Sequence, residues 1–442
     1  MTSRRSHGPC VLAIWFLAAG LAAGQAQPVM LLLDDAIARA LAASHRLEEL
    51  GARRDGAAAQ VESVRTSDRP LVAVHGSYTR TNHVEEFVIR QPIGQVEVLY
   101  PDVPDNYQTR LDLQWPVYTA GRTEASLTAA RADVSAADRD LDTLRADLRL
   151  EVTRAYWSAV TAAEGASVVA ASVRRLEGHL AATRARLDAG LVPPDEVSSV
   201  EAQLASERAL LIETTGLHAQ ALVGLARLIA LPYDTAITLS EPLRSGLTAA
   251  PDIAALVETA KRARQERRAL EDRLTAARAR IDATEAELRP TLAVVSGVDY
   301  ARPNPKRFPR TDIWQESWDV SLNVNWTLFD WGRVRARAAQ GDAGARTLEA
   351  QIAEFDSRLE ADVRQRQLDL EAALARVPAT DVAVAAATET SRVVTRRYDA
   401  GVATATDLLD AESALVRAEV ERTRALSNVR IAAAQLERVT AR

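Results

Sequence analysis

Two carboxylates near the C-terminus have the spacing that most suggests chemistry. Asp407 and Asp410 lie three residues apart in a segment with a helical pattern, so they share one face of that helix. A pair of carboxylates on one face attracts cations and repels anions. The same pair is also consistent with a solvated acidic face, because acidic and basic residues alternate along the whole chain.

The sequence has no pattern that indicates an enzyme. It has no glycine-rich phosphate-binding loop, and Cys10 is the one cysteine. Five histidines follow residue 26 without metal-ligand spacing: His45, His75, His83, His179 and His218. The net charge of −6 excludes a basic nucleic-acid footprint. We therefore expect a protein that is not an enzyme, with no cofactor, no metal and no nucleic-acid partner.

The N-terminus has the pattern of a secretory signal. Two arginines precede an apolar run at 10–23, and small residues follow it, so we expect residues 1–26 to be a cleaved signal peptide. An uncleaved anchor is the alternative, but the run is shorter than the ~20 residues that span a bilayer. Gln25 stands where a lipoprotein has its cysteine, so we expect no lipid anchor.

The chain is a tandem duplication. The stretch WPVYTAGR at 115–122 matches WTLFDWGR at 326–333, and RLDAGL at 186–191 matches RYDAGV at 397–402, both about 211 residues apart. We assign the first repeat to 27–245 and the second to 246–442. The predicted elements are helices at about 33–68, 122–188, 194–230, 253–288, 333–399 and 405–439, and strands at about 71–82, 106–118, 291–301 and 315–329.

The composition and the positions of proline and glycine support this order of helices and strands. The bias toward Ala, Leu, Arg and Glu is typical of long helices and coiled coils. Pro70 and Pro290 end a helix and start a strand, while Gly190 and Gly401 stand where a long helix ends. Pro378 predicts a kink in the second long helix.

The predicted strands have one apolar and one polar face. In 315–329 the apolar face is formed by Trp318, Val320, Leu322, Val324, Trp326 and Leu328. A sheet on a soluble core would alternate in the same way, but strands of 11–13 residues with aromatic ends suit a membrane barrel. Four strands cannot close a barrel, so two or three chains must share one, and polar residues such as Arg110, Asp112, Asp319 and Asn323 favour the wider lumen. The loops at 83–105, with a possible small hairpin, and 302–314 would face the exterior.

These motifs resemble the TolC family of outer-membrane efflux proteins over nearly the whole mature chain. The resemblance rests on the Arg-Pro strand entries at Pro70 and Pro290, the aromatic-x-x-Gly-Arg exits and the helix-turn-helix tips. The exits end in Gly121, Arg122, Gly332 and Arg333. The resemblance implies a mainly α protein with a transmembrane β-barrel. Three identical chains (a homotrimer) would form a 12-stranded barrel among outer-membrane lipids, and a periplasmic α-helical barrel would continue it.

The resemblance also assigns roles to residues. It implies that an adaptor, linked to an inner-membrane pump, docks at Ala189, Gly190, Leu191, Ala400, Gly401 and Val402, although a simple helix C-cap would explain both glycines. It places Tyr398, Glu196, Asp407 and Asp410 at the periplasmic gate. Three chains would turn the two aspartates into acidic rings. Glu196 replaces the Asp usual in the family, and Ala403 replaces a basic residue.

The expected function is a passive gated exit duct of a tripartite efflux or type I secretion system, opened by the adaptor. A periplasmic coiled-coil adaptor or a scaffold is the alternative. An adaptor would lack the duplication and the four amphipathic strands. A scaffold would have no reason to place Trp318 and Leu322 opposite Asp319 and Asn323. The sequence does not identify the substrate among drugs, metal ions and proteins.

Overall fold

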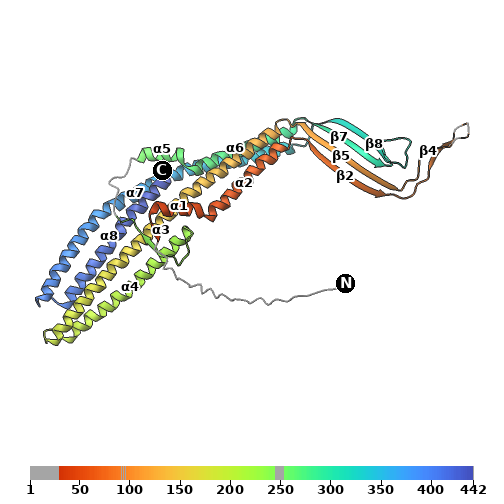
Figure 1. Cartoon of the computed structure of the whole chain (residues 1–442). Coiled ribbons are helices and arrows are strands. Elements are labelled where there is room, and N and C mark those ends of the chain that lie inside the picture. The colour runs from red at the N-terminus through yellow and green to blue at the C-terminus, as the bar shows by residue number, and fades with distance from the viewer. Residues whose placement is uncertain (1–28, 91, 93, 95, 244–252, 442) are drawn as a thin grey trace, which may run out of the picture.

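The chain forms an elongated molecule with a bundle of helices at one end and a β-sheet at the other (Figure 1). The structure is a computed structural model. It describes residues 29–90, 92, 94, 96–243 and 253–441. The predicted signal peptide at 1–26 and the boundary between the repeats at 245 lie outside the described residues.

Two very long helices form the frame of the molecule. α3 (Arg122–Asp188) and α7 (Arg333–Asp399) have 67 residues each, which is about 100 Å of helix. Each turns back into a shorter partner, α4 (Pro194–Leu228) or α8 (Ala405–Thr440), packed beside it. α7 is one continuous helical element through Pro378.

Two helices precede β2 and two precede β7, where the sequence predicted one at each place. The single helices expected at 33–68 and 253–288 are wrong: α1 (Leu33–Ala43) and α2 (His45–Thr66) break at Ser44. Likewise α5 (Ile253–Ala263) and α6 (Gln265–Glu285), which a 3₁₀ turn (η1, Ala286–Leu288) follows, break at Arg264. Both break residues have extended backbone angles, and the Ser44 hydroxyl caps α2 by accepting from the Leu47 amide at 3.4 Å. The Arg264 guanidinium donates to Glu266 and to the Arg438 carbonyl, which holds the second break.

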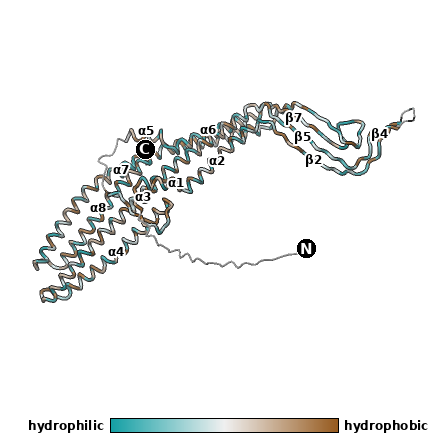
Figure 2. The backbone as a smooth tube through the Cα atoms, viewed as in Figure 1, coloured by the Kyte–Doolittle hydropathy of each residue, from teal (hydrophilic) through white to brown (hydrophobic). Residues whose placement is uncertain are grey.

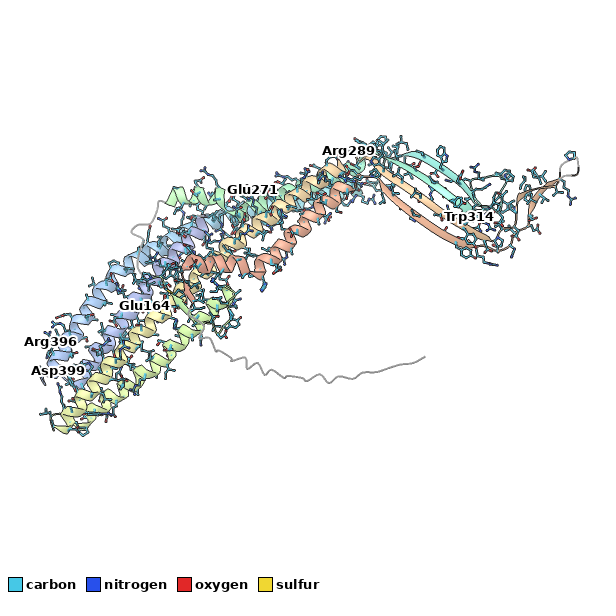
Figure 3. The ribbon with its side chains drawn as sticks, viewed as in Figure 1. Glu164, Glu271, Arg289, Trp314, Arg396 and Asp399 are labelled. Carbon is cyan, nitrogen blue, oxygen red and sulfur yellow. The ribbon has the colours of Figure 1, made fainter. Side chains whose placement is uncertain are left out.

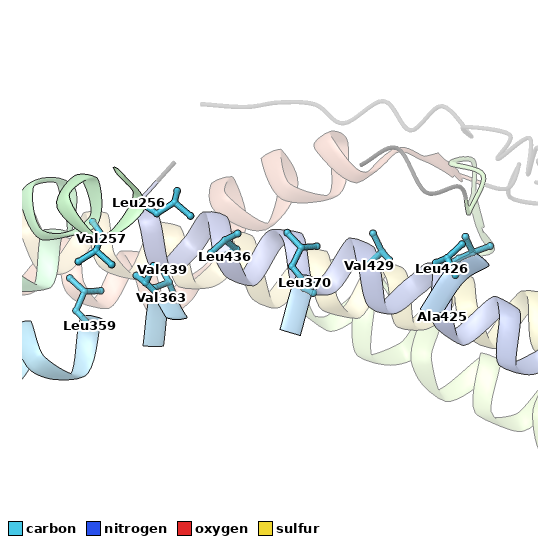
Figure 4. Close-up of a cluster of buried hydrophobic side chains, with 13 residues drawn as sticks. Leu256, Val257, Leu359, Val363, Leu370, Ala425, Leu426, Val429, Leu436 and Val439 are labelled. Atoms are coloured by element: carbon cyan, nitrogen blue, oxygen red, sulfur yellow. The ribbon is translucent and has the colours of Figure 1, made fainter. Parts of the chain in front are cut away.

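The helices bury their apolar stripes in separate clusters along the body. One cluster joins α5, α7 and α8 through Leu256, Val363 and Val429 (Figure 4). A second surrounds Tyr156 and Trp157 of α3, where β1 (Val29–Leu31) pairs in parallel with β6 (Ile237–Leu239). The Tyr156 hydroxyl donates to the Leu31 carbonyl at 3.0 Å, so this strand pair is fixed to the long helix.

Four strands form one antiparallel sheet, in the order β2 (Leu71–Arg80), β5 (Asp105–Tyr118), β7 (Thr291–Arg302) and β8 (Gln315–Asn325). Each repeat contributes two neighbouring strands. The strand expected at 315–329 ends earlier, at Asn325. The indole of Trp326 instead donates to the carbonyl of Leu288 at 3.1 Å, which holds the chain beside the end of η1.

The predicted small hairpin within 83–105 is confirmed. β3 (Phe87–Arg90) pairs with β4 (Val96–Tyr100) in antiparallel fashion. In Figure 1 this hairpin extends beyond the end of the sheet, away from the helices.

Candidate channel and gate

The sheet exposes one apolar face. Because strands alternate, Leu111, Val298 and Trp318 occupy one registered row across β5, β7 and β8. Trp318 is 74% exposed, and the side chains of Val320 and Leu322 are each 63% exposed. Along the strands in Figure 2, hydrophobic and hydrophilic residues alternate. Trp314 stacks on Tyr300 at one end of this face, but the apolar side chains of β8 stay exposed, as contact with lipid requires.

The opposite face of the sheet is charged. Arg110 contacts Asp299 at 2.6 Å and Asp112 at 2.6 Å, and it also reaches Asp319. Asp299 is only 1% exposed, so its charge is neutralised locally. An ionic network on one face and exposed tryptophan on the other describe a sheet between lipid and an aqueous lumen.

The predicted turns join the sheet to the long helices. Gly121 and Gly332 precede α3 and α7 with φ of +87° and +80°, so a left-handed backbone favours glycine at both. The amides of Arg122 and Arg333 donate to the carbonyls of Thr119 and Asp330 at 3.0 and 3.2 Å. Pro70 and Pro290 directly precede β2 and β7. Strand and helix therefore meet at a fixed angle in both repeats.

The two helix tips have the same backbone. Gly190 and Gly401 have φ of +74° and +73°. The next residues, Leu191 and Val402, donate their amides to carbonyls five residues back at 2.8 and 2.9 Å, which closes a Schellman cap. No described atom lies within 4 Å of a Cβ built on either glycine. The caps explain the glycines, and the open space leaves both turns accessible to a partner.

Tyr398 links the two helical hairpins near these tips. It is 2% exposed, and its hydroxyl lies 2.8 Å from the Thr183 hydroxyl of α3 and 3.5 Å from the Glu196 carboxylate of α4. Arg186 donates to the Tyr398 carbonyl at 2.9 Å and to the Asp399 carboxylate at 3.1 Å. In Figure 3, Asp399 lies near the helical end of the molecule, and Trp314 lies at the other end, beside the sheet.

Glu196 and Asp407 occupy equivalent positions in the two repeats but have different partners. The Asp407 carboxylate accepts from the Thr404 amide at 2.9 Å, while Thr404 accepts from the Asp407 amide, so the pair forms a capping box. Those bonds lower the pKa of the Asp407 carboxyl. At the first tip, the N-cap is Pro193, which has neither an amide proton nor a hydroxyl. Glu196 therefore has no capping partner, and its carboxylate can reach Tyr398.

The structure brings Glu196 and Tyr398 together but leaves Asp407 and Asp410 on the exposed surface of α8, outside that contact. Sequence reasoning missed Arg186 and Thr183 as members of the network. Arg186 stands in the duplicated RLDAGL motif, so the repeat alignment marked its position without showing its contact.

A second polar cluster lies farther up the same helices. Glu412 is 3% exposed and accepts from Arg175 and Ser391, both at 2.7 Å. Burial raises the pKa of the nearby Glu207 carboxyl, and the hydrogen bond from Gln203 and the charge of Arg175 partly offset this rise. Burial also lowers the pKa of His179. These titratable groups lie between the two hairpins, where movement of one hairpin against the other would change their burial.

Within the described ranges, no group of three or more His, Cys, Asp or Glu could hold a metal ion. A membrane-compatible sheet continued by two long helical hairpins defines an outer-membrane channel protein.

Comparison with known proteins identifies the family. The outer membrane efflux protein family matches residues 36–231 and 256–442. The chain belongs to this family, and it serves as an outer-membrane exit duct of an efflux system. Protein CyaE of Bordetella pertussis is 28% identical over 386 residues, which cover 87% of this chain and 78% of CyaE.

Solved channel structures share the fold. The outer membrane protein VceC of Vibrio cholerae superposes with a TM-score of 0.76 at 21% identity, over 92% of this chain and 95% of VceC. The MtrE outer membrane channel of Neisseria gonorrhoeae, in its open state, gives 0.76 at 21% identity, over 92% of this chain and 88% of MtrE.

Proposed function

We propose that three copies of the mature chain close a 12-stranded barrel in the outer membrane, and that their helices continue it as a gated periplasmic tunnel. The mature chain begins after the signal peptide 1–26 and carries no lipid. A periplasmic adaptor opens the tunnel by docking at the helix tips and connects it to an inner-membrane pump. The duct itself is passive, because the sequence has no nucleotide-binding loop.

The open sheet carries this proposal. β2 and β8 are the two edges of the sheet, and within the described chain each pairs with a strand on one side only. They run in opposite directions, so the β8 edge of one copy can pair antiparallel with the β2 edge of the next. A bilayer does not tolerate unpaired edges. The interior of an eight-stranded barrel is filled by side chains, so an aqueous lumen lined by Arg110 and Asp319 favours twelve strands.

The helices support assembly as well. α4 exposes apolar side chains that the lone chain does not cover: Ile212 is 75% exposed, Leu217 51% and Val223 48%. Packing of α4 against a helix of the neighbouring copy would bury this stripe and close the wall of the tunnel.

The tips support gating and docking. Thr183, Arg186 and Glu196 connect the first hairpin to Tyr398 and Asp399 of the second, so separation of the hairpins must break these bonds. Leu191 is 75% exposed and Val402 63% exposed, beside glycines with open space around them. A helical hairpin of an adaptor would find apolar contacts and close backbone approach there.

Single-channel conductance of the detergent-extracted oligomer in a planar bilayer tests the proposal. The wild type should give a small cation-selective conductance, and the Asp407→Ala/Asp410→Ala variant should lose selectivity or conduct more. Absence of conductance from an oligomer verified to be inserted would reject the duct. A channel indifferent to the double variant would retain the duct and leave the gate to Tyr398 and Glu196 alone.

A further inference from the structure

The loop between β7 and β8 folds back over the charged face of the sheet. We call residues 303–314 the strap. Asn304 is fully buried, and its side-chain amide donates to the Gln315 carbonyl at 2.9 Å and to the Ser317 hydroxyl at 3.0 Å. Its side-chain oxygen accepts from the Lys306 amide at 2.9 Å. Asn304 therefore sets the course of the strap at its first turn.

Lys306 fixes the strap to the sheet. Its ammonium group lies 2.8 Å from the Asp299 carboxylate and also pairs with Asp319. Asp299 and Asp319 lie on the same face as Arg110, because Asp299 pairs in register with Arg110 and Asp319 with Gly297, two residues along β7. This is the face opposite Trp318, so Lys306 lies on the lumen side.

Gly297 makes room for the same network. A Cβ built on Gly297 would overlap the guanidinium of Arg110. Arg110 therefore lies flat on the backbone of β7 and reaches Asp112, Asp299 and Asp319 at once.

The far end of the strap is also attached. Arg302 pairs with Asp312 through two bonds of 2.8 and 3.0 Å. Arg310 donates its amide to the Leu99 carbonyl at 3.1 Å and its guanidinium to Asn106 at 2.5 Å, so the strap is tied to the first repeat. Trp314, the last residue of the strap, stacks on Tyr300 with ring centroids 5.0 Å apart. Tyr300 shares the apolar face with Val298, so the strap leaves the charged face before β8 begins.

We propose that the strap narrows the outer mouth of the duct, and that Lys306 sets the charge which the mouth presents to the exported substrate. This inference rests on the proposed duct. The network contains three carboxylates (Asp112, Asp299 and Asp319) and two cations (Arg110 and Lys306), a net charge of −1 in each chain. Loss of Lys306 makes it −2, and three chains repeat that change around one lumen.

Lys306→Gln in the full-length mature oligomer tests this, in the same bilayer assay. The variant should conduct more than the wild type, because the strap loses its anchor. Three added negative charges at about one Debye length from the pore axis should also raise the cation concentration in the mouth by about threefold. Lys306→Arg should keep wild-type selectivity.

Two further variants separate width from charge. Asn304→Ala should raise conductance without a change in selectivity, because it frees the strap and leaves the network charge intact. Lys261→Gln is the matched control: Lys261 is the only other lysine, and it pairs with Glu360 at 3.7 Å in the helical body. It should leave both readouts unchanged.

The outcomes distinguish the two proposals. A wild-type oligomer that is inserted but does not conduct would reject the duct itself. The role of the strap would be overturned by a different result: the wild type conducts, and Lys306→Gln and Asn304→Ala, assembled like the wild type, show the same conductance and selectivity.

Discussion

Removal of one oxygen atom should loosen the proposed periplasmic gate. Tyr398→Phe keeps the buried ring and its contact with Arg186, whose guanidinium lies 4.7 Å from the ring centroid. It removes the bond to Thr183 at 2.8 Å and the longer contact with Glu196. Thr183 still donates to the His179 carbonyl at 2.9 Å, so no buried hydroxyl is left without a partner.

The magnitude follows from that single bond. A buried neutral hydrogen bond contributes about 1 kcal/mol net, which changes an equilibrium about fivefold. If three chains open together, the sum is about 3 kcal/mol, and the open population should rise by roughly 100-fold. Because the ring and the helix remain, the melting temperature should change little.

Open probability of single channels, recorded without adaptor, measures the effect. Tyr233→Phe is the control, because Tyr233 is 66% exposed on the connection after α4. An open probability that stays within twofold of wild type, in a variant with a normal melting temperature, would refute a latch at the Tyr398 hydroxyl.

Three other predictions concern the tips and the buried acid. Gly190→Val and Gly401→Val should each cost about 1–2 kcal/mol at a left-handed position and weaken pull-down of the adaptor, whereas Gly165→Ala inside α3 should slightly stabilise the protein. Asp407→Ala should lower the stability of α8 by about 1 kcal/mol through its capping box, while Asp410→Ala should change ion selectivity and leave thermal melting unchanged; equal melting of the two variants would contradict this. Since burial raises the pKa of Glu207, the folded state holds its proton more tightly, and that stabilisation is lost as pH rises through the raised value. Glu207→Gln should therefore reduce the loss of stability that the wild type shows as pH rises above the ordinary pKa range of Glu. Thermal melts from acid to neutral pH measure this, and a variant whose melting temperature follows the wild-type pH curve would contradict the prediction.

The sequence alone predicted the elements that repeat or alternate. The duplicated RLDAGL and RYDAGV motifs located both tips, and alternation from Trp318 to Val324 located the exposed face of β8. These features are local, since a strand face or a glycine cap depends on residues a few positions apart.

Long-range contacts were beyond sequence reasoning. The helical segment 253–285 is interrupted at Arg264, whose guanidinium donates to a carbonyl of α8 more than 170 residues away. The end of β8 depends on a bond from Trp326 to η1, and Lys306 finds Asp299 only when the strap folds back. Hydrophobic periodicity contains no information about which distant carbonyl or carboxylate a side chain will meet.

The difference between Pro193 and Thr404 sets the symmetry of the proposed tunnel mouth. Three duplicated chains would place six nearly identical hairpins around one axis, a ring with approximate sixfold order. At every second hairpin the N-cap is Thr404, which forms a capping box with Asp407 of its own helix. At the others it is Pro193, and the acid is free to hold the neighbouring hairpin. One cap residue thus reduces six equivalent positions to two alternating kinds, and an adaptor ring built from six copies of one protein would meet two different surfaces.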